Sequence, residues 1–170
     1  GAPQYVGFYA MPREAGKVSV AGNYAYVGAG ADGLHVVDVT TPTHPVSVTV
    51  YRANIGHVKD LVVPDSGSPG YPYAYVADAS GKLHVLDVSD PAHPQAVSSL
   101  DLPGSPQNLA LFEGADGRHY AYVPAGYGDL QIVDVSDPAN PQRLAPALTD
   151  WRHGWASDVV VTGQRAYVVW

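Results

Sequence analysis

Tyr73-Ala74-Tyr75-Val76, followed after a glycine-containing turn by Leu83-His84-Val85-Leu86-Asp87-Val88, is the stretch of sequence that decides the fold. The two runs occur together twice more: as Tyr24-Ala25-Tyr26-Val27 with Leu34-His35-Val36-Val37-Asp38-Val39, and as Tyr120-Ala121-Tyr122-Val123 with Leu130-Gln131-Ile132-Val133-Asp134-Val135. The first run begins a fourth time at Ala166-Tyr167-Val168-Val169. Such internal repetition is the sequence signature of a repeat architecture.

Each repeat is long enough for four short strands. The second tyrosine of the first run recurs at intervals of 49, 47 and 45 residues, at Tyr26, Tyr75, Tyr122 and Tyr167. Besides the two quoted runs, each repeat has room for an inner strand before the tyrosines and an outer strand after a pair of prolines. The expected inner strands are residues 18–21, 60–63, 109–112 and 158–162, and the expected outer strands are residues 46–51, 96–102 and 142–148.

The repeat favours a β-propeller. Four antiparallel strands with apolar residues on both faces form a sheet that cannot bury its faces alone, whereas blades stacked around an axis can. A β-sandwich also explains short strands but gives no reason for a fixed repeat. We expect an all-β propeller of four-stranded antiparallel blades, three complete and a partial fourth. It occupies residues 1–170 as one domain, with repeats at about 3–41, 42–90, 91–137 and 138–170.

The partial fourth blade follows from the spacing within a repeat. In each complete copy the second tyrosine precedes the aspartate by 12 residues, as from Tyr26 to Asp38, and from Tyr167 the same interval passes beyond Trp170. We therefore expect the chain to end within a blade. Whether the segment from Gln4 to Tyr9, further residues or another chain completes that blade stays open at this point.

Composition excludes several classes of function. The chain has 170 residues, of which 46% are hydrophobic and 15% charged, so it can bury a sizeable core. The absence of cysteine rules out disulfides, thiolate metal sites and a cysteine nucleophile. A net charge of -7 without a basic run disfavours nucleic acid. No apolar run is long enough to insert into a membrane, and we expect no cofactor.

The second run, with the residues after it, carries a family resemblance. Leu34-His35-Val36-Val37-Asp38, Leu83-His84-Val85-Leu86-Asp87 and Leu130-Gln131-Ile132-Val133-Asp134, each followed by Val-Ser-Asp-Pro or Val-Thr-Thr-Pro, resemble the LVIVD repeat of bacterial and archaeal surface proteins. The resemblance covers nearly the whole chain. It implies a propeller fold and a periplasmic, extracellular or cell-surface setting. It implies little about activity, because the repeat signature is structural.

The residues shared by all repeats are expected to build the scaffold. A carboxylate at the end of a strand accepts hydrogen bonds from the backbone of the next turn, which accounts for Asp38, Asp87 and Asp134. Pro42, Pro91 and Pro138 fix the turn that leads to the outer strand and remove N–H groups near a sheet edge. His35 and His84 are replaced by Gln131, and His44 and His93 by Asn140, so these histidines are interpreted as structural rather than metal-binding.

Function is expected where the repeats differ. The least repeat-like segment is Trp151 to Trp155, in a loop on the face shared by the connections from each outer strand to the next inner strand. Trp, Tyr and Arg dominate interface hot spots, although a tryptophan here could also plug the channel entrance or pack between blades. The candidate partner-binding residues on this face are Trp151, Arg152, His153, Trp155, Arg52, His57 and Tyr127, and Asp78 is expected to join them from a hairpin turn.

Two functions are consistent with these residues. The first is a non-catalytic, extracytoplasmic protein-binding or scaffolding propeller, such as an accessory subunit of a membrane-associated assembly. The alternative is a carbohydrate-binding or hydrolytic propeller that uses His57, His153 and Asp158 at the channel mouth. No catalytic constellation or metal-ligand spacing is visible, so the prediction is a protein without enzymatic activity. The insertion at residues 64–72 would extend from the opposite face and offers a less specific contact surface.

Overall fold

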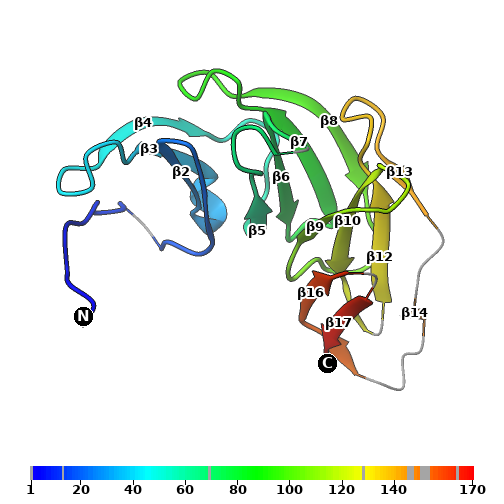
Figure 1. The fold of residues 1–170 in the computed structure, drawn as a ribbon. Helices are drawn as coiled ribbons and strands as arrows, with labels where there is room; N and C mark the ends of the chain where they lie inside the picture. Colours follow the sequence, from blue (N-terminus) through cyan, green and yellow to red (C-terminus); the bar gives the residue numbers. More distant parts are fainter. Residues whose placement is uncertain are drawn as a thin grey trace.

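The strands form successive antiparallel sheets in a computed structural model that describes residues 2–12, 14–68, 70–127, 129–144, 148–149, 154–163 and 165–170 (Figure 1). The fold is a β-propeller, and across the described residues its blades form an open arc rather than a closed ring. One short 3-10 turn, Gly30–Asp32, interrupts the strands. No helix in these ranges is long and apolar enough to cross a bilayer.

The strands follow one another in sequence order within each blade. Blade 1 contains β1 (Val18–Ala21), β2 (Tyr24–Gly28), β3 (Leu34–Asp38) and β4 (Val46–Tyr51). Blade 2 contains β5 (Val58–Val62), β6 (Tyr73–Asp78), β7 (Lys82–Asp87) and β8 (Gln95–Asp101). Blade 3 contains β9 (Ala110–Glu113), β10 (His119–Pro124) and β12 (Asp129–Asp134), with the short strands β13 (Gln142–Arg143) and β14 (Leu148–Thr149) beside β12. After blade 3, β16 (Asp158–Thr162) pairs with β17 (Arg165–Val169), and β11 (Gly126–Tyr127) pairs with β15 (Trp155–Ala156).

One predicted strand is wrong as a continuous element. Among the described residues, the outer strand expected over residues 142–148 forms ladders with β12 at Gln142–Arg143 and at Leu148–Thr149, and Leu144 lies outside a strand although its N–H bonds the Ile132 carbonyl. Pro146 lies between these two short strands in the sequence and lacks the N–H that a continuous ladder needs. The other predicted strands are present, and their ends differ by one or two residues at most.

The core lies between the blades because side chains alternate between the two faces of each sheet. Tyr26 and Leu34 of blade 1 pack against blade 2. Tyr75 and Leu83, at the same repeat positions in blade 2, pack against blade 3. Val76 points the other way and joins the core with blade 1. Burying each such side chain stabilises the fold by about 1.5–3 kcal/mol, so the repeated apolar residues hold neighbouring blades together.

Polar side chains also link neighbouring blades at their inner strands. The Ser19 hydroxyl accepts a hydrogen bond from the N–H of Val63 (3.0 Å) and donates one to its carbonyl oxygen (3.1 Å). The buried carboxylate of Asp60 accepts hydrogen bonds from the N–H groups of Leu61 and Leu109, both 2.8 Å long. Burial raises the pKa of Asp60 although both bonds oppose this. The Asp60–Leu109 bond joins blade 2 to blade 3 beside the site described next.

Candidate functional site

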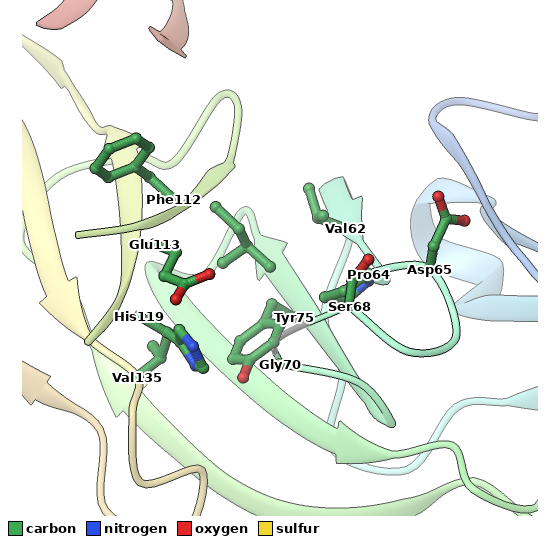
Figure 2. A pocket seen from close by; sticks show the side chains of 11 residues that line it. Val62, Pro64, Asp65, Ser68, Gly70, Tyr75, Phe112, Glu113, His119 and Val135 are labelled. Atoms are coloured by element: carbon green, nitrogen blue, oxygen red, sulfur yellow. The ribbon is translucent and has the colours of Figure 1, made fainter. Parts of the chain in front are cut away.

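A cavity of about 280 Å³ lies between blades 2 and 3, and we call it the interblade pocket (Figure 2). Val62 of β5 and Tyr75 of β6 belong to its blade 2 wall. Leu111 and Glu113 of β9 and His119 of β10 belong to its blade 3 wall. The pocket is therefore built from two blades whose strands have no shared ladder.

The hydroxyl of Tyr75 is the polar atom buried in this pocket. The side chain has no exposed surface, and its hydroxyl has no hydrogen-bond partner in the part of the chain that the structure describes. Burial, with a smaller effect of Tyr73, raises the pKa of Tyr75 to about 12, so the hydroxyl keeps its proton at neutral pH. An unsatisfied buried polar group costs about 1–3 kcal/mol of stability.

Glu113 and His119 present a carboxylate and an imidazole to the same pocket. The two residues are directly opposite each other in the β9–β10 ladder, so their side chains lie on one face of blade 3. Figure 2 shows both side chains on the blade 3 side of the pocket, across from Asp65 and Ser68 of the insertion. Glu113 is exposed and His119 is half-buried. Among the described residues, neither side chain has a hydrogen-bond partner, so both remain available to a ligand.

The insertion after β5 covers part of the pocket. Its backbone turns are closed by hydrogen bonds from the N–H of Ser68 to the carbonyl of Asp65 (2.8 Å) and from the N–H of Tyr73 to the carbonyl of Gly70 (3.0 Å). Gly70 has a φ of +89°, and a Cβ there would lie 3.8 Å from the Tyr75 hydroxyl oxygen. A glycine at this point lets the loop pass close to that hydroxyl.

The opposite face of the arc carries the residues that the sequence singled out. Arg52 forms an ion pair with Asp32, with 2.7 Å between Nη2 and Oδ1. Asp32 also binds Nε2 of the buried His35 at 2.9 Å. His57 lies against Gly30, at the edge of a second cavity of about 340 Å³. Asp32, which lines this second cavity with Glu14 and His57, is already held by its two partners.

The tryptophan-rich segment is only partly described. Trp151, Arg152 and His153 lie outside the described residues, as does the side chain of Tyr127. Trp155 is 41% exposed, and its indole lies over the backbone of Gly126, whose φ is +81°. The β11–β15 ladder pairs Trp155 with Tyr127. Trp155 thus belongs to the β11–β15 ladder, whereas Arg52 and His57 lie in the loop between β4 and β5.

Asp78 lies against the loop that contains Gly56, on the face where it was expected, but its side chain is buried and does not present a binding group there. The residue is completely buried, and its carboxylate accepts hydrogen bonds from the N–H groups of Gly56, Ser80 and Lys82, from the Ser80 hydroxyl, and from His84 Nε2 at 2.8 Å. Burial alone would raise the pKa of Asp78, but these bonds outweigh burial and lower it to about 2. Asp78 therefore connects the loop before β5, the turn between β6 and β7, and strand β7 itself.

This pKa predicts a loss of stability in acid. Because the folded-state pKa of Asp78 lies below the unfolded value of 3.8, its contribution is present above pH 3.8 and disappears as the pH falls towards 2. At about 1.4 kcal/mol per pKa unit, the contribution is about 2.5 kcal/mol. Urea unfolding at pH 6 and pH 2 measures it: Asp78→Asn should lose about 2 kcal/mol less than the wild type over this range, because the folded-state carboxylate is still half ionised at pH 2. An equal loss in both proteins would contradict the assignment.

The insertion at residues 64–72, which the sequence offered as a less specific contact surface, supplies part of the pocket lining, whereas sequence reasoning missed Tyr75, Glu113 and His119. Tyr75 belongs to the repeated run and was interpreted as core, which it also is. The sequence did contain a signal for His119, because the repeats differ at its position: blade 1 has Asn23 there and blade 2 has Pro72. The three positions are equivalent, since in each blade the backbone carbonyl at this position accepts a hydrogen bond from the valine that follows the third strand. No group of three or more His, Asp or Glu side chains suited to a metal occurs within the described part of the chain. His153 of the proposed His57, His153 and Asp158 trio lies outside that part.

Comparison with known families identifies the repeat. A family model described as the LVIVD repeat matches residues 12–53, 55–101 and 104–144. The chain belongs to the LVIVD repeat family. No curated protein matches this sequence.

Solved structures similar to this LVIVD chain show the same fold. A functionally unknown protein from Desulfotomaculum acetoxidans has a TM-score of 0.65 and 10% identity, over 80% of this chain and 43% of that one. The computationally designed Ika4 protein has a TM-score of 0.67 and 14% identity, over 98% of this chain and 92% of its own. Saccharomyces cerevisiae Sqt1 has a TM-score of 0.68 and 13% identity, over 90% of this chain and 39% of its own. The LVIVD chain thus spans less than half of two of these proteins, and the likeness shows the fold alone.

The repeated aspartates of the LVIVD signature have internal partners. Asp38, Asp87 and Asp134 each accept a hydrogen bond from the N–H two residues later, with lengths of 2.8, 2.8 and 3.0 Å. Asp134 also forms an ion pair with Arg118. The turns with Pro42, Pro91 and Pro138 are each closed by a bond from the N–H of His44, His93 or Asn140 to the carbonyl three residues earlier. These carboxylates and turns belong to the scaffold of each blade.

Proposed function

We propose that this LVIVD chain is a non-catalytic binding propeller that holds a protein partner at the interblade pocket. The observation that carries this proposal is the solvent-accessible interblade pocket, which is lined by Glu113, His119 and Tyr75. The buried Tyr75 hydroxyl has no hydrogen-bond partner among the described residues. Native proteins rarely leave such a group unsatisfied without a functional reason.

The distribution of hydrogen bonds supports binding rather than catalysis. Asp60 and Asp78 are buried and occupied by backbone or histidine donors, which leaves them no role with a substrate. Among the described residues, no hydrogen bond joins Glu113 to His119 in the interblade pocket. These two side chains therefore do not form the hydrogen-bonded base and orienting group that would activate a catalytic nucleophile. The pocket instead combines apolar walls with a few convergent polar groups, as binding sites do.

The proposal includes the setting of the protein. We propose that it works outside the cytoplasm, in the periplasm or at the cell surface, as an accessory subunit or scaffold. Support for this comes from the resemblance of its repeats to those of surface proteins. The arc of blades, in which core packing joins blade 1 to blade 2 and blade 2 to blade 3, suits a protein whose role is to hold a partner in place.

Site-specific photo-crosslinking in the organism that makes the protein tests the proposal. A photoreactive phenylalanine analogue at exposed Ser68, on the rim of the pocket, should give a discrete adduct with a partner protein. The same analogue at Arg52, on the opposite face, is the matched control and should give at least fivefold less adduct. Equal amounts of adduct at Ser68 and Arg52 would contradict the interblade pocket as the specific binding site. The absence of an adduct at both positions would contradict the protein-binding role.

A further inference from the structure

The two ends of the arc expose the surfaces by which neighbouring blades pack on one another. We infer that a second copy of this chain docks there head to tail, so that the β16–β17 hairpin of one copy packs on blade 1 of the next. The hairpin and blade 1 lie at opposite ends of the arc (Figure 1). The inference concerns a surface other than the interblade pocket and is independent of the proposed function.

Each interface inside the arc joins two different kinds of blade face. We call the face with the second repeat tyrosine, such as Tyr26 or Tyr75, the leading face, and the opposite face the trailing face. Tyr26 shares a core with Leu61 and Val63 of the trailing face of blade 2, and Tyr75 shares one with Leu109 of blade 3. These side chains are at most 4% exposed. A leading face is therefore covered by the trailing face of the next blade.

The same positions are exposed at the ends of the arc. In the hairpin, the repeat tyrosine Tyr167 is 55% exposed, and Val160, opposite it in the ladder and thus also on the leading face, is 59% exposed. On the trailing face of blade 1, Val18 and Val20 of β1 are 62% and 52% exposed, at the positions where blade 2 has its two buried aliphatic residues. One end of the arc thus exposes a leading face and the other a trailing face, and a second copy can cover both.

The repeat predicts which side chains meet between the copies. Inside the arc, the Ser19 hydroxyl bonds the N–H and the carbonyl of Val63 in the next blade. Val160 has the position of Ser19, because each lies opposite the second repeat tyrosine of its own blade. Val20 has the position of Val63. Val160 of one copy should therefore contact Val20 of the next copy, as an apolar pair.

A polar contact is predicted in the same way. The Asp60 carboxylate accepts one hydrogen bond from the N–H of the following residue and a second from the N–H of Leu109 in the next blade. Asp158 has the equivalent position in β16 and accepts the first of these bonds, at 2.8 Å, but no second bond from the described residues. Val18 has the position of Leu109. The N–H of Val18 in the next copy would supply the second bond to Asp158.

The N-terminal segment shows that another blade fits beside blade 1. Residues 3–12 share the sequence frame of residues 94–103, which contain the outer strand β8, because both begin with Pro-Gln and end with Pro. A Cβ at Gly7 would overlap the carbonyl oxygen of Pro42, and its counterpart Ser98 bonds the equivalent proline carbonyl of the next blade at 2.6 Å. The segment thus lies where the outer strand of a preceding blade belongs. Together with the hairpin of another copy, it supplies three of the four strands of that blade.

The proposed contact is heterologous, because it joins two different surfaces. Heterologous contacts form a closed ring when their rotation closes and a filament when it does not. Two copies would supply six complete blades and two shared ones, and propellers have about four to eight blades. We therefore expect a ring of two copies.

Sedimentation velocity of the 170-residue chain over a range of concentrations tests the inference. The wild type should form a dimer. Val160→Lys and Val20→Glu should each weaken association at least tenfold, because each places an unpaired charge against an apolar side chain. Val97→Glu is the matched control, since Val97 is a partly exposed valine of the outer strand β8, away from both ends of the arc. The control should associate within twofold of the wild type.

A mixture of the two interface variants distinguishes the head-to-tail arrangement from other dimers. Equimolar Val160→Lys and Val20→Glu should associate at least fivefold more tightly than either variant alone. In the mixed dimer, one interface is that of the wild type, and the other places the introduced lysine against the introduced glutamate. Unfolding midpoints of the variants, measured at a concentration where the wild type is monomeric, identify any loss that comes from misfolding.

Three outcomes would overturn the inference. The first is a wild-type chain that stays monomeric at the highest concentration that remains soluble. The second is a loss of association in Val160→Lys without a loss in Val20→Glu, which would show that two hairpins pack on each other. The third is an equal loss in the control Val97→Glu, which would place the contact on the outer strands.

Discussion

Replacing Asp78 by alanine is expected to lower the free energy of unfolding at pH 7 by about 4 kcal/mol. The carboxylate is completely buried and accepts bonds from three backbone N–H groups, a serine hydroxyl and an imidazole. Alanine would leave the N–H groups of Gly56 and Lys82 and the ring of His84 without this partner, and each unsatisfied donor adds to the cost. Urea unfolding followed by circular dichroism measures the difference.

Asp87 provides the matched control for this variant. Its carboxylate ends the neighbouring strand of the same blade and accepts one backbone bond, from Ser89 at 2.8 Å. Asp87→Ala should cost only about 1 kcal/mol, because that N–H lies at an exposed turn where water can replace the carboxylate. Similar losses for Asp78→Ala and Asp87→Ala would show that the burial and bond count of Asp78 do not govern the stability of blade 2.

Gly104→Ala is expected to cost about 3 kcal/mol, the second largest effect. Gly104 lies in the loop from blade 2 to blade 3 with a φ of +86°, and a Cβ there would overlap the carbonyl oxygen of Ala125. The adjacent N–H of Ser105 bonds that same oxygen at 3.0 Å, so the loop cannot move away without losing the bond. The midpoint of urea unfolding should fall while its slope stays unchanged.

The contact at Gly104 can be separated from its backbone conformation. Gly67 has a similar φ of +91°, but nothing lies within 4 Å of the place where its Cβ would be. Gly67→Ala therefore carries the conformational cost alone, about 1 kcal/mol. If both alanine variants lose the same stability, the close approach of Gly104 to Ala125 contributes nothing and the prediction fails.

The fold could be predicted from the sequence because its decisive signal is repetition. The Tyr-Ala-Tyr-Val run and the Leu-x-Val-Val-Asp-Val run follow each other in the same order in three copies. Each copy therefore supports the same strand assignment in the others. The ends of the strands were predicted less accurately, because they depend on turns that differ between repeats. The split outer strand of blade 3 is an example. Pro146 was the sequence signal for that split.

The candidate site was harder to predict because its residues come from two blades. Tyr75 looks like every other core tyrosine of the repeat, and only the packing of blade 3 shows that its hydroxyl is left without a partner. Glu113 and His119 are far from Tyr75 in sequence, and no local spacing connects them. Asp78 was misinterpreted for a related reason, because a polar residue beside a hairpin turn gives no sign that a loop from before β5 covers it.

The walls of the interblade pocket belong to sheets that share no backbone ladder, and this has a mechanical consequence. A small tilt of blade 3 against blade 2 widens or narrows the cavity while every strand keeps its neighbours. Within such a stack, relative blade tilt is a softer motion than any distortion of a sheet. A side chain bound between the two walls would contact both blades and restrict their relative tilt, so occupancy of the pocket would make the arc stiffer.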